Sequence, residues 1–405
     1  MSFDLTKLAS QLQPLASKLR GSMAERERRL DVAEATLRDA SCGQDVLARK
    51  LRDSDGTCTF LLPRLREPLD TAHDPPVAPE DYVALAVDGS HIDVDRHSPA
   101  RCYVINTGRV MLRYGASPGA RLDSEPRVYL DEDDLFFADP DGTREVPVEG
   151  ALLGLKRAVL EAQALASLVA ETPPDLPAIA LLDGSLVLWG LAGQNVPDFV
   201  RRELLDAGLL PALDALRQVS KQRPLAVASY ISLPRGSDVM GAVRLQRCPY
   251  EVADCDRHCG TLRPGKRPCD EAAYGLTDRD LFARLLRPGQ RSAVFGSTSS
   301  IVQKHYGEHQ VCFFYLHAGQ ELARVELPQW VADDESMMGL AHTLTLDQSR
   351  RGMGYPVSLQ EAHEQAVLSG ADRQQFWSLV QASLDEEALP SATSAKAFSK
   401  RVRWL

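Results

Sequence analysis

The sequence lacks any stretch that could cross a membrane. Its 405 residues contain no run of about 18 uninterrupted apolar residues, and the first twenty residues lack the apolar core of a secretion signal. We therefore expect a cytoplasmic protein without membrane contact. In that reducing compartment, the eight cysteines are not expected to form a disulfide framework.

Two further absences limit the function. The sequence has no GxxxxGK[ST] loop, so we do not expect this chain to hydrolyse ATP itself. It also has no excess of positive charge, because its formal net charge is −10. The surface as a whole is therefore not expected to attract a nucleic acid over long range. Phosphate contacts must come from a local basic patch or from a partner.

What is present is a change of pattern along the chain. Leucines at helical spacing predict one or two amphipathic helices within residues 4–52, a packing or dimerisation arm, at Leu5, Leu8, Leu12, Leu15 and Leu19. A Pro-rich linker then leads to predicted strands at 82–93, 100–115 and 126–137, a helix at 148–171 and a buried strand at 178–189. Three strands, a helix and a strand is the order of a ribonuclease H-like core.

The second half repeats the α/β alternation. A helix ends at LRQVSK, and the predicted elements that follow are strands at 224–232, 309–318 and 322–330 and helices at about 333–350, 357–370 and 372–388. We predict an α/β fold with a ribonuclease H-like mixed sheet flanked by helices. The predicted domains are a helical arm and linker (1–75), a ribonuclease H-like domain (76–390) with a Cys-bearing insertion (246–276), and a basic tail (391–405).

Two apolar strands end in the same tripeptide, Asp-Gly-Ser. ALAVDGS presents Asp88 and AIALLDGS presents Asp183. A single Asp-Gly is a common turn signal, and a capping aspartate is its usual explanation. If the two strands are adjacent and parallel, however, both carboxylates lie at one sheet edge, where a divalent metal is the natural counter-ion.

Three other positions are candidates for the same site. The predicted helix at 148–171 carries Glu161, which could complete a metal pair, with Glu149 near the helix start as the competing carboxylate. Lys221 could stabilise phosphoryl charge, or it is a solvated lysine at a helix end. His363, in a C-terminal helix after Gly-Tyr-Pro, is a metal ligand or phosphate contact, or a hydrogen-bonded core histidine.

Four of the eight cysteines fall within 22 residues, at Cys248, Cys255, Cys259 and Cys269. They could bind zinc or an iron–sulfur cluster, and His258 could replace one thiol. The spacing is not that of a paired CxxC knuckle, and free cysteines in an inert insertion are the alternative. Basic residues flank them, as a phosphate-binding face or as solvated charges, at Arg257, Arg263, Lys266 and Arg267.

Together, VDGS near 88, LLDGSL near 183, VSK near 221 and GYPVSLQEAHEQA at 354–366 resemble the NurA family of nucleases. The resemblance runs in order over about 80–390. It implies a ribonuclease H-like, Mn²⁺-dependent nuclease, with Mg²⁺ as an alternative ion, that acts on single-stranded DNA and on duplex ends. It also implies a homodimer that works with a hexameric ATPase of the HerA type in the resection of double-strand breaks.

For single residues, the resemblance implies that Asp88, Asp183 and His363 are metal ligands. Glu161 would be the helix carboxylate, and Lys221 would be catalytic or phosphate-binding. The expected activity is 5'-to-3' exonuclease plus single-strand endonuclease. Two other readings stay open: a non-catalytic DNA-repair assembly subunit, and another ribonuclease H-like phosphodiesterase.

Overall fold

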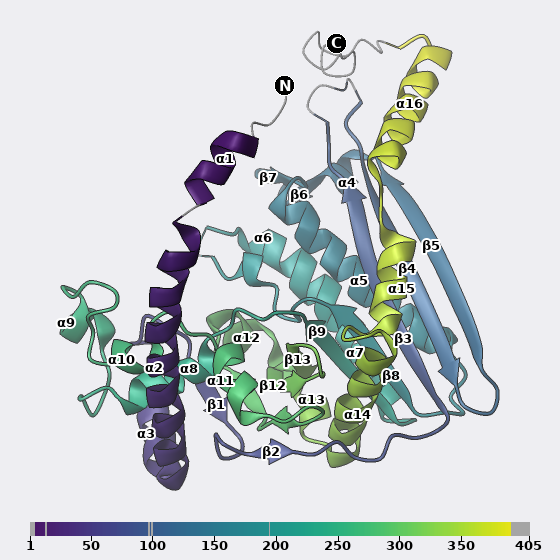
Figure 1. Ribbon diagram of the computed structural model, residues 1–405. Coiled ribbons are helices and arrows are strands. Elements are labelled where there is room, and N and C mark those ends of the chain that lie inside the picture. The colour runs from purple at the N-terminus through teal and green to yellow at the C-terminus, as the bar shows by residue number, and fades with distance from the viewer. Residues whose placement is uncertain (1–4, 13, 96–97, 99, 194, 390–405) are drawn as a thin grey trace. The chain divides into compact units, whose positions relative to one another are not determined.

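The chain folds into a mixed α/β structure in the computed structural model, which describes residues 5–12, 14–95, 98, 100–193 and 195–389 (Figure 1). Its contacts divide it into two units. Unit 1 comprises the described residues within Met1–Asp74, Ser232–Ser299 and Phe313–Arg324. Unit 2 comprises those within Pro75–Ile231, Ser300–Cys312 and Val325–Leu405. Each unit is therefore assembled from segments far apart in the sequence.

The core of unit 2 is a five-stranded arrangement. β3 (Tyr82–Ile92), β4 (Tyr103–Tyr114) and β5 (Gly119–Tyr129) form an antiparallel meander, and β8 (Ala178–Asp183) and β9 (Leu225–Ile231) continue the sheet parallel to β3. The strand order is β5-β4-β3-β8-β9. This order confirms the predicted ribonuclease H-like sheet. β8 and β9 are buried along almost their whole length, which explains why they read as continuous apolar runs.

Helices cover both faces of this sheet. The Cβ of a residue at Gly89 would lie 2.6 Å from Glu161 Oε1 of α5, whereas a Cβ at Gly108 would lie 2.3 Å from a backbone carbonyl of α15. Gly108 is paired with Asp88, the neighbour of Gly89, and neighbouring residues of a strand point to opposite faces. Helices α5 (Ala151–Glu171) and α15 (Val357–Ala366) therefore pack on opposite faces of β3 and β4.

The remaining elements of unit 2 are short strands and further helices. They are α4 (Glu132–Leu135), β6 (Phe136–Ala138), β7 (Glu145–Pro147), η1 (Trp189–Leu191), α6 (Asp198–Arg201), the π-helix η2 (Arg202–Leu209), α7 (Leu210–Ser220), α12 (Ser300–His305), η3 (Gly307–His309), α13 (Gln329–Ala332), α14 (Glu335–Arg351) and α16 (Gly370–Glu386). The predicted third strand, 126–137, was misplaced, because β5 occupies 119–129. Its side chains are mostly exposed, so no apolar alternation marks it.

Unit 1 combines helices with short strands. The helices are α1 (Leu5–Leu12), α2 (Leu15–Cys42), α3 (Gln44–Asp53), α8 (Asp238–Gln246), α9 (Cys255–Cys259), α10 (Asp270–Ala273) and α11 (Asp278–Leu285). The strands are β1 (Pro63–Leu65), β2 (Ala72–His73), β10 (Arg291–Ser292), β11 (Phe295–Ser297), β12 (Val311–His317) and β13 (Leu322–Pro328), of which the last two are divided between the units. β1 pairs with β11, and β10 pairs with β2 and β12.

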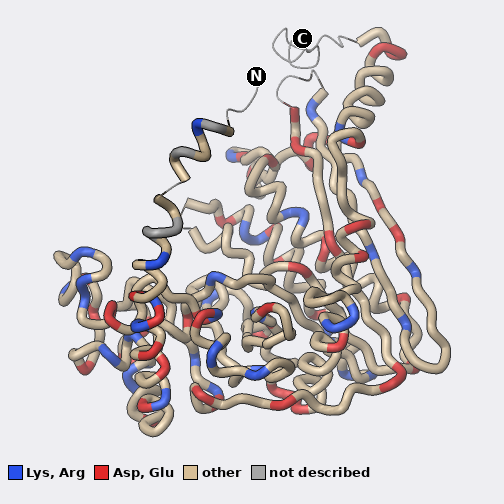
Figure 2. The backbone as a smooth tube through the Cα atoms, viewed as in Figure 1, with Lys and Arg blue, Asp and Glu red and all other residues tan. Residues whose placement is uncertain are grey.

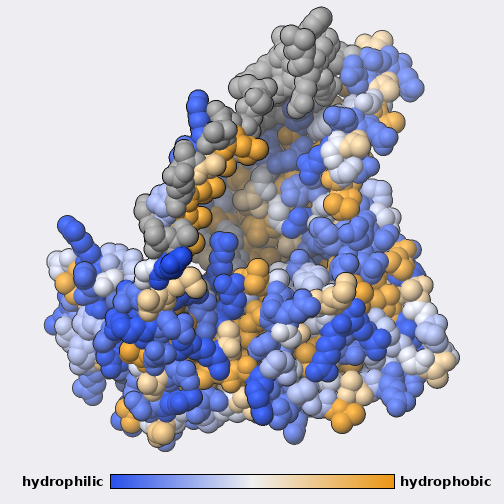
Figure 3. Space-filling model, viewed as in Figure 1, coloured by the Kyte–Doolittle hydropathy of each residue, from blue (hydrophilic) through white to orange (hydrophobic). Residues whose placement is uncertain are grey.

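The predicted N-terminal helices are confirmed, and the burial of their apolar side chains changes along the segment. In α2 and α3, Leu30, Leu37 and Leu47 enter the hydrophobic core of unit 1. Figure 2 shows acidic and basic residues interleaved along α2, and the pair Glu25 and Arg29 lies at 2.9 Å. The first turns instead expose their apolar side chains, visible in Figure 3, as at Leu5, Leu8, Leu12, Leu15 and Leu19.

No helix among the described residues is long and apolar enough to span a membrane. The predicted domain boundaries at 75 and 390 and the insertion boundaries at 246 and 276 stay predictions. The predicted basic tail, 391–405, lies outside the described residues.

The contact at Gly108 gives a first prediction. Gly108→Ala should lower the free energy of unfolding by about 1–3 kcal/mol, because the added methyl group meets the backbone of α15. Urea denaturation measures this change. Gly119→Ala in β5 is the matched control, since a Cβ there meets nothing within 4 Å. Equal stability of the two variants would contradict the close packing of α15 on β4.

Candidate functional site

Asp88 and Asp183 lie side by side at one edge of the sheet of unit 2. β3 and β8 are parallel, and their last paired residues are Val87 and Leu182. The next residue on each strand is the aspartate, so the predicted adjacent and parallel arrangement is confirmed. The predicted turn is confirmed only after β8, where Gly184 has a φ of +85°. β3 itself continues to Ile92, so Asp88-Gly89-Ser90 is extended strand and not a turn.

The carboxylate of Asp88 has two partners. Its Oδ1 accepts a hydrogen bond of 2.8 Å from the N–H of Gly89, and its Oδ2 lies 2.8 Å from Nδ1 of His363. The Asp88 side chain is 14% exposed and that of His363 is 62% exposed. One imidazole nitrogen therefore orients Asp88, while the ring as a whole remains accessible to a substrate or an ion.

Helix α15 is held in place by polar side chains of β3 and β4. The hydroxyl of Ser90 and the amide Nδ2 of Asn106 both donate to the carbonyl oxygen of Ala366, the latter at 2.8 Å. Asn106 Nδ2 also donates to Gln365 O at 3.1 Å. The serine of the first Asp-Gly-Ser thus fastens the helix that carries His363, and this fixes the imidazole relative to Asp88.

Asp183 is held by Tyr355, a residue that the sequence analysis did not single out. Tyr355 donates a hydrogen bond to the Asp183 carboxylate, and the ring of Tyr355 meets Tyr230 edge-on at 5.4 Å between centroids. The protein atoms packed around the carboxyl raise the pKa of Asp183, and the charge of Asp88 raises it further, although Tyr355 and His363 act in the opposite direction. Tyr355 lies between α14 and α15, where no local pattern of the sequence marks a contact with Asp183.

Glu161 reaches the aspartates from α5, and it is 6% exposed. Its Oε1 forms an ion pair of 3.0 Å with Nε of Arg157, and the N–H of Gly89 also interacts with the Glu161 carboxyl group. Burial raises the pKa of Glu161 to about 8, and the charges of Asp88 and Asp183 add to this rise against the influence of Arg157. The close approach of Glu161 to the strand requires a glycine at position 89.

These carboxylates are suited to a divalent cation by their chemistry. Oxygen ligands are those that Mg²⁺ and Mn²⁺ prefer, and the buried carboxyl group of Glu161 interacts with both aspartates. Within the described part of the chain, no three His, Cys, Asp or Glu side chains are gathered closely enough to hold one ion as they stand. Binding would therefore require the side chains to move closer together.

The structure places Lys221 away from these carboxylates, and its catalytic or phosphate-binding role stays a prediction. Lys221 is exposed at the end of α7, four residues before β9 begins at Leu225. Leu225 is paired with Ala178, at the end of β8 opposite to Asp183. Five residues of strand, about 17 Å, thus separate the level of Lys221 from the carboxylates. The alternative reading, a solvated lysine at a helix end, describes its position.

The structure also distinguishes between the two candidate glutamates. Glu149 precedes α5, whereas Glu161 lies three turns into the helix, where its charge interacts with both aspartates. The structure therefore brings Glu161, and not Glu149, to Asp88 and Asp183. The roles of these residues in catalysis and metal binding stay predictions.

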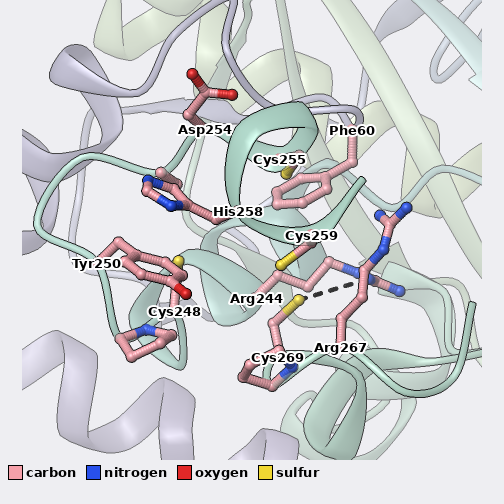
Figure 4. A pocket seen from close by; sticks show the side chains of 13 residues that line it. Phe60, Arg244, Cys248, Tyr250, Asp254, Cys255, His258, Cys259, Arg267 and Cys269 are labelled. Carbon is pink, nitrogen blue, oxygen red and sulfur yellow. Dashed lines mark hydrogen bonds between the residues drawn. The ribbon is translucent and has the colours of Figure 1, made fainter. Parts of the chain in front are cut away.

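The four clustered cysteines belong to unit 1. They line a single pocket together with His258 (Figure 4). The flanking Arg257 is exposed within α9, and Arg263 and Lys266 are exposed on the loop that follows it, where Figure 2 shows several basic segments.

Residues 82–368, well over half of the chain, match the family model described as the NurA domain. No curated protein sequence matches the chain. Among solved structures, an Argonaute of Aquifex aeolicus matches with 10% identity and a TM-score of 0.25, over 70% of this chain and 28% of its own. The type 1 ribonuclease H called LC9-RNase H1 matches with 9% identity and a TM-score of 0.19, over 41% of this chain and 71% of its own. Likenesses at these scores carry no argument about the site.

The buried glutamate predicts how stability depends on pH. In the folded, metal-free protein Glu161 holds its proton up to about pH 8, against an ordinary value of 4.5. Glu161 therefore contributes its full stabilisation below pH 4.5, the ordinary pKa of a glutamate. This contribution is lost as the pH rises through about 8. Between these limits, in a chelator, the wild type should lose a few kcal/mol of unfolding free energy that Glu161→Gln retains.

Urea denaturation of both proteins at three pH values across this range measures the difference. Glutamine has the size of the protonated acid, so the packing around α5 is preserved in the variant. Parallel pH profiles for the two proteins would show that Glu161 does not take up a proton on folding.

Proposed function

Because this chain belongs to the NurA family of nucleases, we propose that it is a metal-dependent DNA nuclease whose active site is built on Asp88 and Asp183. The observation that carries the proposal is the register of β3 and β8. It brings two carboxylates from parallel strands to the same sheet edge, and a third, Glu161, adds its charge from the covering helix. Like charges at this proximity favour a cation as their counter-ion.

We propose Mn²⁺ as the ion, with Mg²⁺ as the alternative, held by Asp88, Asp183 and His363 and supported by Glu161. When bound, the ion would lower the pKa of a water molecule and stabilise charge on the scissile phosphodiester. Sulfur ligands select softer metals than carboxylates do, so the four thiols of unit 1 form a candidate metal site of different chemistry.

The other side chains of the site orient these ligands. The hydrogen bond from Tyr355 holds the Asp183 carboxylate and favours its ionised form. His363 holds Asp88 in the same way, and its exposed ring can also contact the phosphate of a substrate. Arg157, next to Glu161, supplies positive charge that favours the ionised glutamate. These residues position the two aspartates, while a bound cation would take the place of the proton that Glu161 holds in the metal-free protein.

We propose DNA single strands and duplex ends as substrates, with 5'-to-3' exonuclease and single-strand endonuclease activity in double-strand break repair, in the cytoplasm. Support for this, and for a hexameric ATPase of the HerA type as the partner, comes from the family. The net charge of −10 is consistent with DNA delivery by such a motor. The exposed leucines of α1 and of the first turns of α2 are candidates for a homodimer interface.

Two alternatives remain distinguishable by experiment. A non-catalytic assembly subunit would use the aspartates only for structure and would show no cleavage with any metal, with or without the motor. A different phosphodiesterase on the same fold would prefer RNA or small phosphodiesters to DNA.

Asp88→Asn tests the proposal directly. We expect cleavage of end-labelled single- and double-stranded DNA with Mn²⁺ by the wild type, none in EDTA, and a rate lower by roughly two orders of magnitude or more in the variant, because the ligand loses its charge. The matched control is Asp206→Asn, which changes an exposed aspartate of η2. An active Asp88→Asn protein, or faster cleavage of RNA than of DNA, would refute the proposal.

Tyr355→Phe tests the positioning of Asp183. Loss of the phenol should raise the Mn²⁺ concentration needed for half-maximal cleavage by roughly 10–100-fold, because the carboxylate loses its hydrogen bond. The defect should be smaller at higher pH, where Asp183 ionises without that help. A variant with an unchanged Mn²⁺ requirement would show that Tyr355 only packs against its neighbours.

A further inference from the structure

We propose that the four cysteines of the insertion bind an iron–sulfur cluster of the [4Fe–4S] type, independently of the proposed nuclease activity. The ligands are Cys248, Cys255, Cys259 and Cys269. All four belong to unit 1, and they come from three different elements. Cys248 follows α8 by two residues, Cys255 and Cys259 begin and end α9, and Cys269 directly precedes α10.

The four thiols surround one pocket. Its lining includes all four cysteines, together with His258, Arg244 and Arg267. Figure 4 shows their sulfur atoms around a shared space, with the stacked rings of Tyr250 and His258 on one side. Four cysteines that are up to 21 positions apart in the sequence thus line the same pocket with their thiols.

Two thiols of the insertion are more buried than some of its aliphatic side chains. Val252 and Leu262 are 44% and 40% exposed, whereas Cys259 and Cys269 are 9% and 8% exposed. Other apolar residues of the insertion join the hydrophobic core of unit 1, namely Ala253, Ala272, Ala273 and Leu276. The helices of the insertion are short, five residues in α9 and four in α10, and short segments of this kind are commonly fastened by disulfides or metals. All four thiols are free.

The spacing of the thiols favours a cluster over a single zinc ion. Four sulfurs around one zinc, each at about 2.3 Å, stand about 3.8 Å from one another. In the part of the chain that the structure describes, no three potential ligands approach one another in a way that could hold one ion. In a cubane cluster each thiolate binds a different iron, so the sulfurs stand farther apart around a larger space. Four thiols that share a pocket without converging on a point match the second arrangement.

Positive charge is placed beside the thiols, as a cluster with four thiolate ligands requires. Arg244 Nη1 lies 3.9 Å from Sγ of Cys269, and Arg267 lines the same pocket. Lys50 donates to the carbonyl of Cys248 at 2.7 Å. Hydrogen bonds and charges of this kind stabilise cluster thiolates and tune their reduction potential.

A fifth cysteine, Cys58, lies against Cys255 but does not line the pocket. Because it does not line the pocket, we assign it as a neighbour of the cluster and not as a ligand.

Metal analysis of the full-length protein tests the proposal. The chain is purified without oxygen, or reconstituted with ferrous iron and sulfide, and its iron, acid-labile sulfide and zinc are measured together with its visible absorption. We expect close to four iron and four sulfide per chain, with the broad visible absorption of a cluster. Zinc in place of iron, or no stoichiometric iron after reconstitution, would overturn the proposal.

Two substitutions locate the cluster. Cys259→Ser should lose most of the iron, whereas Cys42→Ser, at an exposed cysteine that ends α2, should retain it. Cys58→Ser should also retain four iron per chain. Circular dichroism distinguishes loss of iron from loss of fold, and the wild-type metal content decides the question even if a variant does not fold. Full iron content in Cys259→Ser, or its loss in Cys42→Ser, would contradict the assignment.

Discussion

The parallel pairing of β3 with β8 is the constraint on which the site of unit 2 depends. It sets two aspartates next to each other, and their repulsion must be balanced by the surroundings. The other site residues reduce this repulsion by hydrogen bonds, by opposite charge or by protonation. His363 and Tyr355 hold one carboxylate each, and Arg157 lies beside the third. The buried Glu161 reduces the repulsion because it retains a proton.

The sequence predicted the features of the site that are local. Apolar runs ending at Asp88 and Asp183 mark central strands, because strands covered on both faces are apolar throughout. The helix with Glu161 and the order of the elements were also predicted, because apolar periodicity is a local property of the sequence. The fold class followed from that order, and the observed sheet confirms it.

Features that depend on register or on distant contacts were not predictable. Lys221 was placed at the site because its sequence motif is close to the family pattern, yet the pairing of Leu225 with Ala178 puts it at the opposite end of β8. Tyr355 was missed because its contact with Asp183 spans a large part of the chain. β5 was misplaced because an exposed strand carries no apolar alternation. In each case the missing information is three-dimensional and has no local signal.

The two candidate metal sites differ in the kind of atom they offer. The site of unit 2 offers carboxylate oxygens and an imidazole, which suit hard ions, whereas the pocket of unit 1 offers sulfur. Such sites do not compete for the same metal. The difference also separates their expected tasks, since oxygen-bound ions polarise phosphates, while a thiolate-bound cluster can fasten a segment whose helices are short.

The contact between Asp88 and His363 joins residues that are 275 positions apart. A ribosome therefore adds 275 residues after Asp88 before the second member of the pair exists. Each unit likewise waits for its last segment, which starts at residue 313 in unit 1 and at residue 325 in unit 2. A nascent or prematurely released chain that stops at the end of α14, Arg351, carries both aspartates but neither Tyr355 nor His363. The order of synthesis thus withholds a complete site from unfinished molecules.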